Sequence, residues 1–179
     1  MLITEEYREA QKKLHENPEY GTASVGFAPL VARIIDQYEV DELLDYGAGK
    51  LRLLKTIADK RLVSRKFRYV PYEPADERYD NQPMPCEMVT CIDVLEHVEP
   101  ELLDNVLDDL KRVTGWIGFF TVHSGPAAKV LPDGRNAHLT QQDMGWWLPK
   151  FCDRFDVQTV QKIPSGFWIL VQKKESLDN

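Results

Sequence analysis

The sequence lacks several features that would place it in a specialised class of protein. It has only three cysteines in 179 residues, and Cys86, Cys91 and Cys152 show no Cys-x-x-Cys spacing. This pattern argues against a disulfide framework or a zinc knuckle, and Cys91, inside an apolar run, is expected in the core. No apolar run is long enough to cross a bilayer, and the first residues carry no secretion signal. We therefore expect a cytoplasmic protein without a membrane anchor.

Basic residues are also few relative to acidic ones. Lys and Arg number 22 against 29 Asp and Glu, which gives a formal net charge of −7 at pH 7. An acidic chain lacks the broad basic face that usually holds nucleic acid. Short basic stretches occur at residues 60–61 and 65–68, where a solvated helix end or turn explains them as well. Nucleic acid is disfavoured as a partner, while these stretches leave the possibility open.

The chain alternates apolar, β-branched runs with amphipathic helical patterns and contains no repeats. Strands are expected at residues 42–46, 67–72, 88–92, 115–122, 155–162 and 166–173, and helices at residues 4–15, 28–38, 51–60, 100–110 and 146–151. This alternation predicts an α/β protein with a doubly wound, mostly parallel sheet. The hairpin-like spacing of the last two runs predicts an antiparallel final strand.

Two of the expected strands end at a carboxylate. The first runs into Asp45 and is followed by Gly47 and Gly49, and the second ends at Glu73. Glycines let a backbone approach a ligand where a Cβ would collide. A carboxylate can accept hydrogen bonds from both hydroxyls of a ribose. In an α/β fold this pattern predicts a nucleoside site at the carboxyl edge of the sheet.

The spacing of these glycines argues against two other kinds of nucleotide site. A dinucleotide-binding fold would place the last glycine of Gly-x-Gly-x-x-Gly where Arg52 stands. A phosphate loop would need a hydroxyl residue after Gly49 and Lys50, and Leu51 stands there. An ordinary strand-to-helix turn, with glycines only for geometry, stays open for residues 45–49 taken alone.

A third motif, Asp-Val-Leu-Glu-His-Val at residues 93–98, follows the strand expected at residues 88–92. Together with the segments around Asp45 and Glu73, in this order, it resembles the class I S-adenosylmethionine (SAM)-dependent methyltransferases. The resemblance implies the Rossmann-like fold of that family, SAM as cofactor and transfer of a methyl group. The family's first motif reads acid-x-Gly-x-Gly-x-Gly, and Leu51 replaces its third glycine here.

The resemblance also implies which residues hold the cofactor. Similar methyltransferases fold a segment that precedes the sheet over the cofactor as a lid, and residues 20–24 lie in such a segment. We therefore expect one domain over residues 1–179, with residues 1–40 as a helical lid or cap, although a packing linker stays open for residues 20–24. The cofactor-binding residues implied are Asp45, Gly47, Gly49, Glu73, Asp93 and Tyr20.

Several polar side chains are expected at the edge where the motifs meet. Methyl transfer from a sulfonium needs a positioned acceptor and often the removal of a proton. Histidine is suited to that task near neutral pH. Roles in capping a helix or orienting a loop stay open for the histidines. The predicted catalytic residues are Asp93, His97, His123 and His138.

A metal site is an alternative to this metal-free prediction. Small-RNA 2′-O-methyltransferases resemble this chain at acid-x-x-Glu-His and bind a divalent ion with a further histidine. Two oxygens and two imidazoles would suit Mn²⁺, Fe²⁺ or Zn²⁺. Many metal-free relatives also carry Glu-His, so the main prediction includes no metal. The residues of the alternative site are Asp93, Glu96, His97 and His138.

The chain between Glu73 and Met88 is too short for the helix and strand that the family has there. We expect a loop in their place, where Asp76 or Asp80 could contact adenine. Methyl transfer to an O or N atom of a small or modest-sized acceptor is the predicted function. A non-catalytic module that binds SAM or its demethylated product, or a protein partner, stays open, as does another SAM-using transfer or cleavage.

Overall fold

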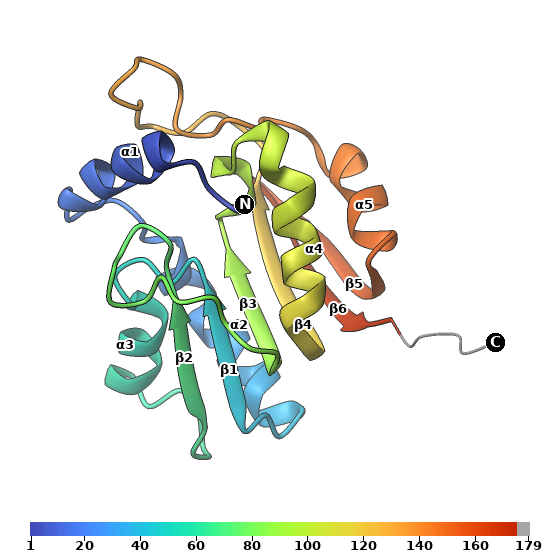
Figure 1. Ribbon diagram of the computed structural model, residues 1–179. Helices are drawn as coiled ribbons and strands as arrows, with labels where there is room; N and C mark the ends of the chain where they lie inside the picture. The colour runs from blue at the N-terminus through green and yellow to red at the C-terminus, as the bar shows by residue number, and fades with distance from the viewer. Residues whose placement is uncertain (175–179) are drawn as a thin grey trace.

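The computed structural model describes residues 1–174 and shows a six-stranded sheet with helices on both faces (Figure 1). The strand order is β2-β1-β3-β4-β6-β5. The first four strands pair in parallel, and β6 runs antiparallel to both of its neighbours. The predicted fold class is confirmed. The strands are β1 (Glu42–Tyr46), β2 (Arg68–Tyr72), β3 (Cys86–Ile92), β4 (Thr114–His123), β5 (Phe155–Ile163) and β6 (Gly166–Lys173).

The helices agree with the sequence pattern except at two N-termini. The second helix begins at Ala23, earlier than expected, because Ala23 and Phe27 pack on the same core as its later turns. The helix expected from Pro100 divides into a 3₁₀ turn and α4. The helices are α1 (Glu5–Glu16), α2 (Ala23–Gln37), α3 (Arg52–Asp59), α4 (Leu103–Val113) and α5 (Met144–Cys152), with 3₁₀ turns η1 (Leu95–His97) and η2 (Pro100–Leu102).

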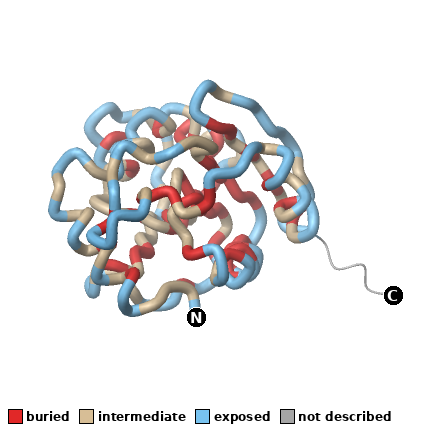
Figure 2. The backbone as a smooth tube through the Cα atoms, turned by 90° about the horizontal axis from the view of Figure 1, so that it is seen from above, coloured by how far each residue is buried: buried red, intermediate tan, exposed pale blue. Residues whose placement is uncertain are grey.

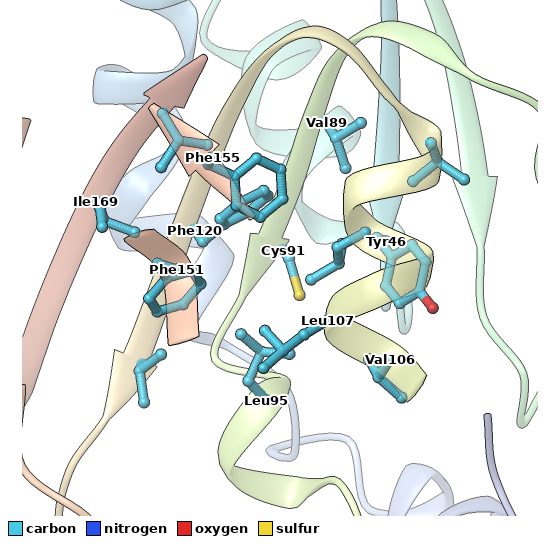
Figure 3. Close-up of a cluster of buried hydrophobic side chains, with 14 of the residues drawn as sticks. Tyr46, Val89, Cys91, Leu95, Val106, Leu107, Phe120, Phe151, Phe155 and Ile169 are labelled. Atoms are coloured by element: carbon cyan, nitrogen blue, oxygen red, sulfur yellow. The ribbon is translucent and has the colours of Figure 1, made fainter. Parts of the chain in front are cut away.

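Side chains that alternate along the strands build a core on each face of the sheet. Leu43 packs with α2 and α3 on one face, whereas Leu44 packs with α4 and α5 on the other. Figure 3 shows the second cluster, in which Cys91 lies among Leu95, Leu107 and other apolar side chains. Cys91 is fully buried, as the apolar run around it predicts.

The segment between β2 and β3 contains neither a helix nor a strand, as its length predicts. As a result, β2 is an edge strand of the sheet. Pro71 lies in this strand opposite Asp45. Proline is tolerated at an edge because it has no N–H for a further strand to use. The trimmed segment therefore ends the sheet at β2.

In the sheet, β2 lies on one side of β1 and β3 lies on the other, so the connections after β1 and β2 run in opposite directions. Loops that leave adjacent strands in opposite directions open a crevice at the carboxyl edge of a sheet. In Figure 1, α1 and the loop of residues 124–143 lie across this edge, and Figure 2 views the molecule from above it. Within residues 1–174, no helix combines the length and apolarity needed to cross a membrane.

Candidate active site

A cavity of about 380 Å³ lies at the crevice between β1 and β3. Its walls come from the turn after β1, the end of β2, the loop after β3, residues 19–24 and one face of α1. A volume of this size is typical of small-molecule sites. All the predicted cofactor-binding and catalytic residues line it: Tyr20, Asp45, Gly47, Gly49, Glu73, Asp93, His97, His123 and His138.

Asp45, the penultimate residue of β1, is a buried carboxylate with 4% of its surface exposed. It accepts hydrogen bonds from the hydroxyls of Tyr69 and Thr90, the latter at 3.0 Å. Burial raises the pKa of Asp45 to about 6, and the two hydrogen bonds oppose that rise. A positive charge in the cavity would favour the ionised form of this carboxylate.

The turn after β1 needs glycine at position 47. Gly47 has a φ of +82°, and a Cβ there would overlap the Cγ2 atom of Val94. The N–H groups of Gly47 and Ala48 both donate to the carbonyl of Tyr72, at 2.8 and 2.9 Å. Leu51, where the family motif has its third glycine, also adopts a left-handed conformation with a φ of +56°. Leu51 thus adopts a backbone conformation that glycine takes most readily.

Glu73 links the end of β2 to this turn. Its Oε2 atom accepts a hydrogen bond from the N–H of Gly49 at 2.9 Å, and its Oε1 atom accepts one from Ala75 at 3.1 Å. Burial raises the pKa of Glu73, and the two backbone bonds favour its charged form. Each oxygen keeps a second lone pair. The carboxylate can therefore still accept hydrogen bonds from a ligand in the cavity.

Asp93 follows β3 in a left-handed conformation, with a φ of +50°. Its N–H donates to the hydroxyl oxygen of Thr121 at 2.9 Å, and its carboxylate accepts a hydrogen bond from the same hydroxyl. A non-glycine residue in this conformation is held there by its surroundings, and such residues cluster at functional sites. The contacts with Thr121 hold Asp93 at the wall of the cavity.

The four histidines of the chain all line this cavity. With Tyr20 they form a continuous row of ring contacts, in the order His15, Tyr20, His97, His138, His123. The successive centroid distances are 5.2, 5.9, 4.6 and 4.8 Å. The row runs from the glycine turn to the end of β4, and so joins the cofactor-binding and catalytic residues predicted from the sequence.

Two of these histidines have a defined tautomer. The Nδ1 atom of His97 lies 2.8 Å from the carbonyl oxygen of Ala137, and that of His138 lies 2.6 Å from the carbonyl oxygen of Gly125. A carbonyl oxygen only accepts hydrogen bonds, so each Nδ1 carries the proton when the ring is neutral. The Nε2 atom of each ring is then free to accept a proton or bind a metal.

Glu96 lies behind these rings and is fully buried. Its Oε1 atom accepts a hydrogen bond from the N–H of His123 at 3.0 Å, whereas its Oε2 atom has no partner within the described chain. Burial, and then the charge of Asp93, raise the pKa of Glu96 well above its usual range. Glu96, His97 and His138 each bring one ligand atom within 4.8 Å of the others, and Asp93 is not part of this group.

His97 is poorly suited to act as a general base. Burial, with a further contribution from His138, lowers the pKa of His97 to about 3. A general base works best with a pKa near the working pH. His97 therefore stays neutral in the folded protein, which favours a hydrogen-bonding or metal-binding role. Burial also lowers the pKa of His138.

The structure adds residues of α1 that the sequence analysis missed. Tyr7 donates from its hydroxyl to the carbonyl of His97, and Gln11 donates to the Tyr7 hydroxyl at 2.7 Å. Tyr20 in turn donates to the Oε1 atom of Gln11 at 3.1 Å. The signal in the sequence is the spacing of four residues between Tyr7, Gln11 and His15, which puts them on one helical face. Charged neighbours on the other faces obscure it.

No protein-family model and no curated protein sequence matches the chain. Solved structures do match. A Burkholderia thailandensis 1,6-didemethyltoxoflavin-N1-methyltransferase, with bound 1,6-didemethyltoxoflavin and S-adenosylhomocysteine, aligns over 98% of this chain and 92% of its own, with a TM-score of 0.65 and 12% identity. A SAM-dependent methyltransferase from Aquifex aeolicus aligns over 94% of this chain and 98% of its own, with a TM-score of 0.56 and 14% identity.

A small RNA methyltransferase, HEN1, also resembles the chain in structure. The alignment covers 84% of this chain and 25% of that protein, with a TM-score of 0.59 and 10% identity. At such low identities these likenesses show the fold. The chain therefore has the fold of SAM-dependent methyltransferases.

Proposed function

We propose that this protein is a SAM-dependent methyltransferase that acts on an O or N atom of a small or modest-sized acceptor. One observation carries the proposal: the cavity joins a nucleoside-type end, with Asp45, the glycine turn and Glu73, to an end lined by histidines. The fold neighbours support it, because one of them is a methyltransferase bound to S-adenosylhomocysteine.

The cofactor would lie along the carboxyl ends of β1 and β2. Glu73 would accept hydrogen bonds from the ribose hydroxyls through its free lone pairs. The glycine turn and Asp45 would surround the methionyl group, whose positive charges would lower the raised pKa of Asp45. The cofactor supplies the methyl group as part of a sulfonium. Asp93 and Tyr20 complete the walls on either side.

The acceptor would lie between the cofactor and the row of histidines. Asp93, His123 and His138 would orient its nucleophilic atom, and the free Nε2 atom of His138 is the best placed to take up a proton. His97 would assist by fixing the neighbouring rings, because its lowered pKa keeps it neutral. Such positioning in a partly closed cavity can supply a large part of the rate enhancement of a bimolecular displacement.

A divalent metal ion is a second candidate feature of the same site. It is favoured because Glu96, whose Oε2 atom has no partner within the described chain, brings a ligand atom within 4.8 Å of one on His97 and one on His138. The backbone carbonyls that fix both Nδ1 atoms are the outer partners that orient metal-binding histidines. These three residues would hold the ion. When bound, a divalent ion would lower the pKa of an acceptor hydroxyl.

The organisation of the N-terminal residues is part of the proposal. We propose that α1 and residues 17–22 form a cap over the cofactor, since they line the cavity, whereas α2 packs into the core of the sheet. The cytoplasm remains the expected location, which cell fractionation would test. Limited proteolysis would show whether the chain behaves as a single domain.

Calorimetry with SAM, S-adenosylhomocysteine and NADH tests the proposal. We expect micromolar binding of the two adenosyl ligands, lost in Asp45→Ala and Glu73→Ala and kept in Asp59→Ala, an exposed acid on α3. NADH should not bind. Binding without turnover on a broad panel of acceptors would favour the non-catalytic alternative. Absence of adenosyl binding would reject the methyltransferase and leave a protein used for interaction. Cofactor cleavage without methyl transfer would favour another SAM-using reaction.

A further inference from the structure

The inner face of α1 is a fixed wall of the cavity. At one end, the N–H and hydroxyl groups of Thr4 donate to the two carboxylate oxygens of Glu99, at 2.9 and 2.6 Å. At the other end, the ammonium of Lys50 donates to the carbonyls of Asn17 and Tyr20. The helix residues that this wall presents lie four apart in the sequence: Tyr7, Gln11 and His15. Ile3, which precedes the helix, continues the spacing.

His15, the last of this row, lies directly on the glycine turn. Its Cε1 atom is 3.4 Å from the position that a Cβ of Gly49 would take, and its Nδ1 atom is 4.0 Å from it. Neither ring nitrogen of His15 has a hydrogen-bond partner within residues 1–174, whereas each of the other three histidines uses its Nδ1 atom. His15 is half-buried and lines the cavity.

Several other donors at this turn are already engaged. The N–H groups of Gly47 and Ala48 serve the carbonyl of Tyr72, and that of Gly49 serves Glu73. The ammonium of Lys50 serves the carbonyls of residues 17 and 20. Among the described side chains that line the cavity, the His15 ring is therefore a donor left free for an anion beside the turn. The acidic side chains that line the cavity cannot take this role.

We infer that His15 donates a hydrogen bond to the carboxylate of the methionyl group of the cofactor. The inference rests on the proposed function, which places the methionyl group at the glycine turn and the ribose at Glu73. A carboxylate at the glycine turn would lie beside the His15 ring, a donor that has no other hydrogen-bond partner within residues 1–174. An anionic group on the methyl acceptor, such as a carboxylate or phosphate, could bind His15 instead. The experiment distinguishes the acceptor from the cofactor as the source of the anion.

The test compares SAM with decarboxylated SAM, which keeps the sulfonium and the amino group and lacks only the carboxylate. Calorimetry would measure both ligands with the wild type, His15→Ala and His15→Gln. We expect His15→Ala to weaken SAM binding about tenfold or more, as for one charge-assisted hydrogen bond, and to leave decarboxylated SAM unchanged. His15→Gln, which keeps a donor, should recover part of the loss. Lys13→Ala, on the exposed face of α1, controls for disturbance of the helix.

Other outcomes would overturn the inference in distinguishable ways. Equal weakening of both ligands would show that His15 only supports the wall. Unchanged binding of both ligands, with a raised KM for the acceptor, would assign the anion to the acceptor instead. If the wild type binds neither adenosyl ligand, the proposed function itself fails. Thermal unfolding of each variant would show that the comparison is made between folded proteins.

Discussion

His97 and His138 meet edge to face, with ring centroids 4.6 Å apart, although one lies in η1 and the other in the loop of residues 124–143. Each directs its Nδ1 atom at a backbone carbonyl of that loop, from Ala137 and Gly125 respectively. The pair thus ties the loop to the end of β3. Both rings also belong, with Glu96, to a group whose ligand atoms all lie within 4.8 Å of one another.

Divalent metal ions should stabilise the folded protein through these three residues. We expect Mn²⁺ or Zn²⁺ at about one hundred times its dissociation constant to add about 2.7 kcal/mol to the free energy of unfolding. For a chain of this size that is a rise in Tm of roughly 5–10 °C. Differential scanning fluorimetry would measure it. His138→Ala should lose the response, and His15→Ala, outside the group, should keep it. A wild type that responds to neither ion would contradict the metal candidate.

Replacement of Glu96 by glutamine should change how stability depends on pH. Burial raises the pKa of Glu96, so the folded state binds its proton more tightly than the unfolded state. The resulting stability is complete below the ordinary pKa of glutamate and is lost as the pH rises towards the folded value. Glu96→Gln cannot ionise and can still accept from the N–H of His123.

We therefore expect the variant to gain on the wild type as the pH rises above the ordinary pKa of glutamate, by up to about 1.4 kcal/mol per pH unit until the raised folded pKa is reached. Urea unfolding in the presence of a chelator would measure the difference. Parallel pH curves for the two proteins would show that Glu96 is not a buried carboxyl with a raised pKa.

Gly47→Ala should destabilise the protein by more than the cost of placing alanine in a left-handed backbone conformation. The left-handed conformation costs about 1–2 kcal/mol for any residue with a Cβ. Gly134→Ala is a matched control, because Gly134 has a φ of +85° and nothing within 4 Å of its Cβ position. Gly47→Ala adds an overlap with Val94, so its loss of stability should exceed that of the control by about 1–3 kcal/mol.

The added loss should come from the side chain of Val94. Combining Gly47→Ala with Val94→Ala should therefore recover much of it, which chemical denaturation of the four proteins would show as a coupling energy. Adenosyl-ligand binding should fall in Gly47→Ala and persist in Gly134→Ala. Equal losses of stability in the two glycine variants would mean that the turn can shift away from Val94.

Thr4→Val should loosen α1 from the rest of the site. The hydroxyl of Thr4 caps the helix by accepting from the N–H of Tyr7, and it also donates to Glu99. We expect a loss of about 1–2 kcal/mol for the cap, with faster hydrogen exchange confined to α1. Thr159→Val, at an exposed position of β5, is a control of the same chemistry. Unchanged exchange in α1 would show that other contacts anchor the helix.

The local pattern of the sequence predicted most of the fold. The apolar run that leads into Asp45 predicted β1 at residues 42–46, and chain length alone showed that residues 73–85 cannot hold the missing helix and strand. The predicted site residues share one cavity for a related reason. Parallel strands end at a common edge, so Asp45, Glu73 and Asp93 meet wherever these strands pair.

The sequence by itself thus determined where the strands lie and in which order the motifs follow one another. It also determined the edge of the sheet at which Asp45, Glu73 and Asp93 gather, because strand positions follow from local periodicity and the shared edge follows from strand direction. Only the tertiary structure decided which loop residues join them. Tyr7 packs with Leu131 and Ala137, and this contact brings α1 and the loop of residues 124–143 together over the cavity. Such long-range packing, which no local pattern encodes, decides where His15 and His138 lie. It also leaves one oxygen of Glu96 without a partner and keeps Asp93 out of the group formed by Glu96, His97 and His138.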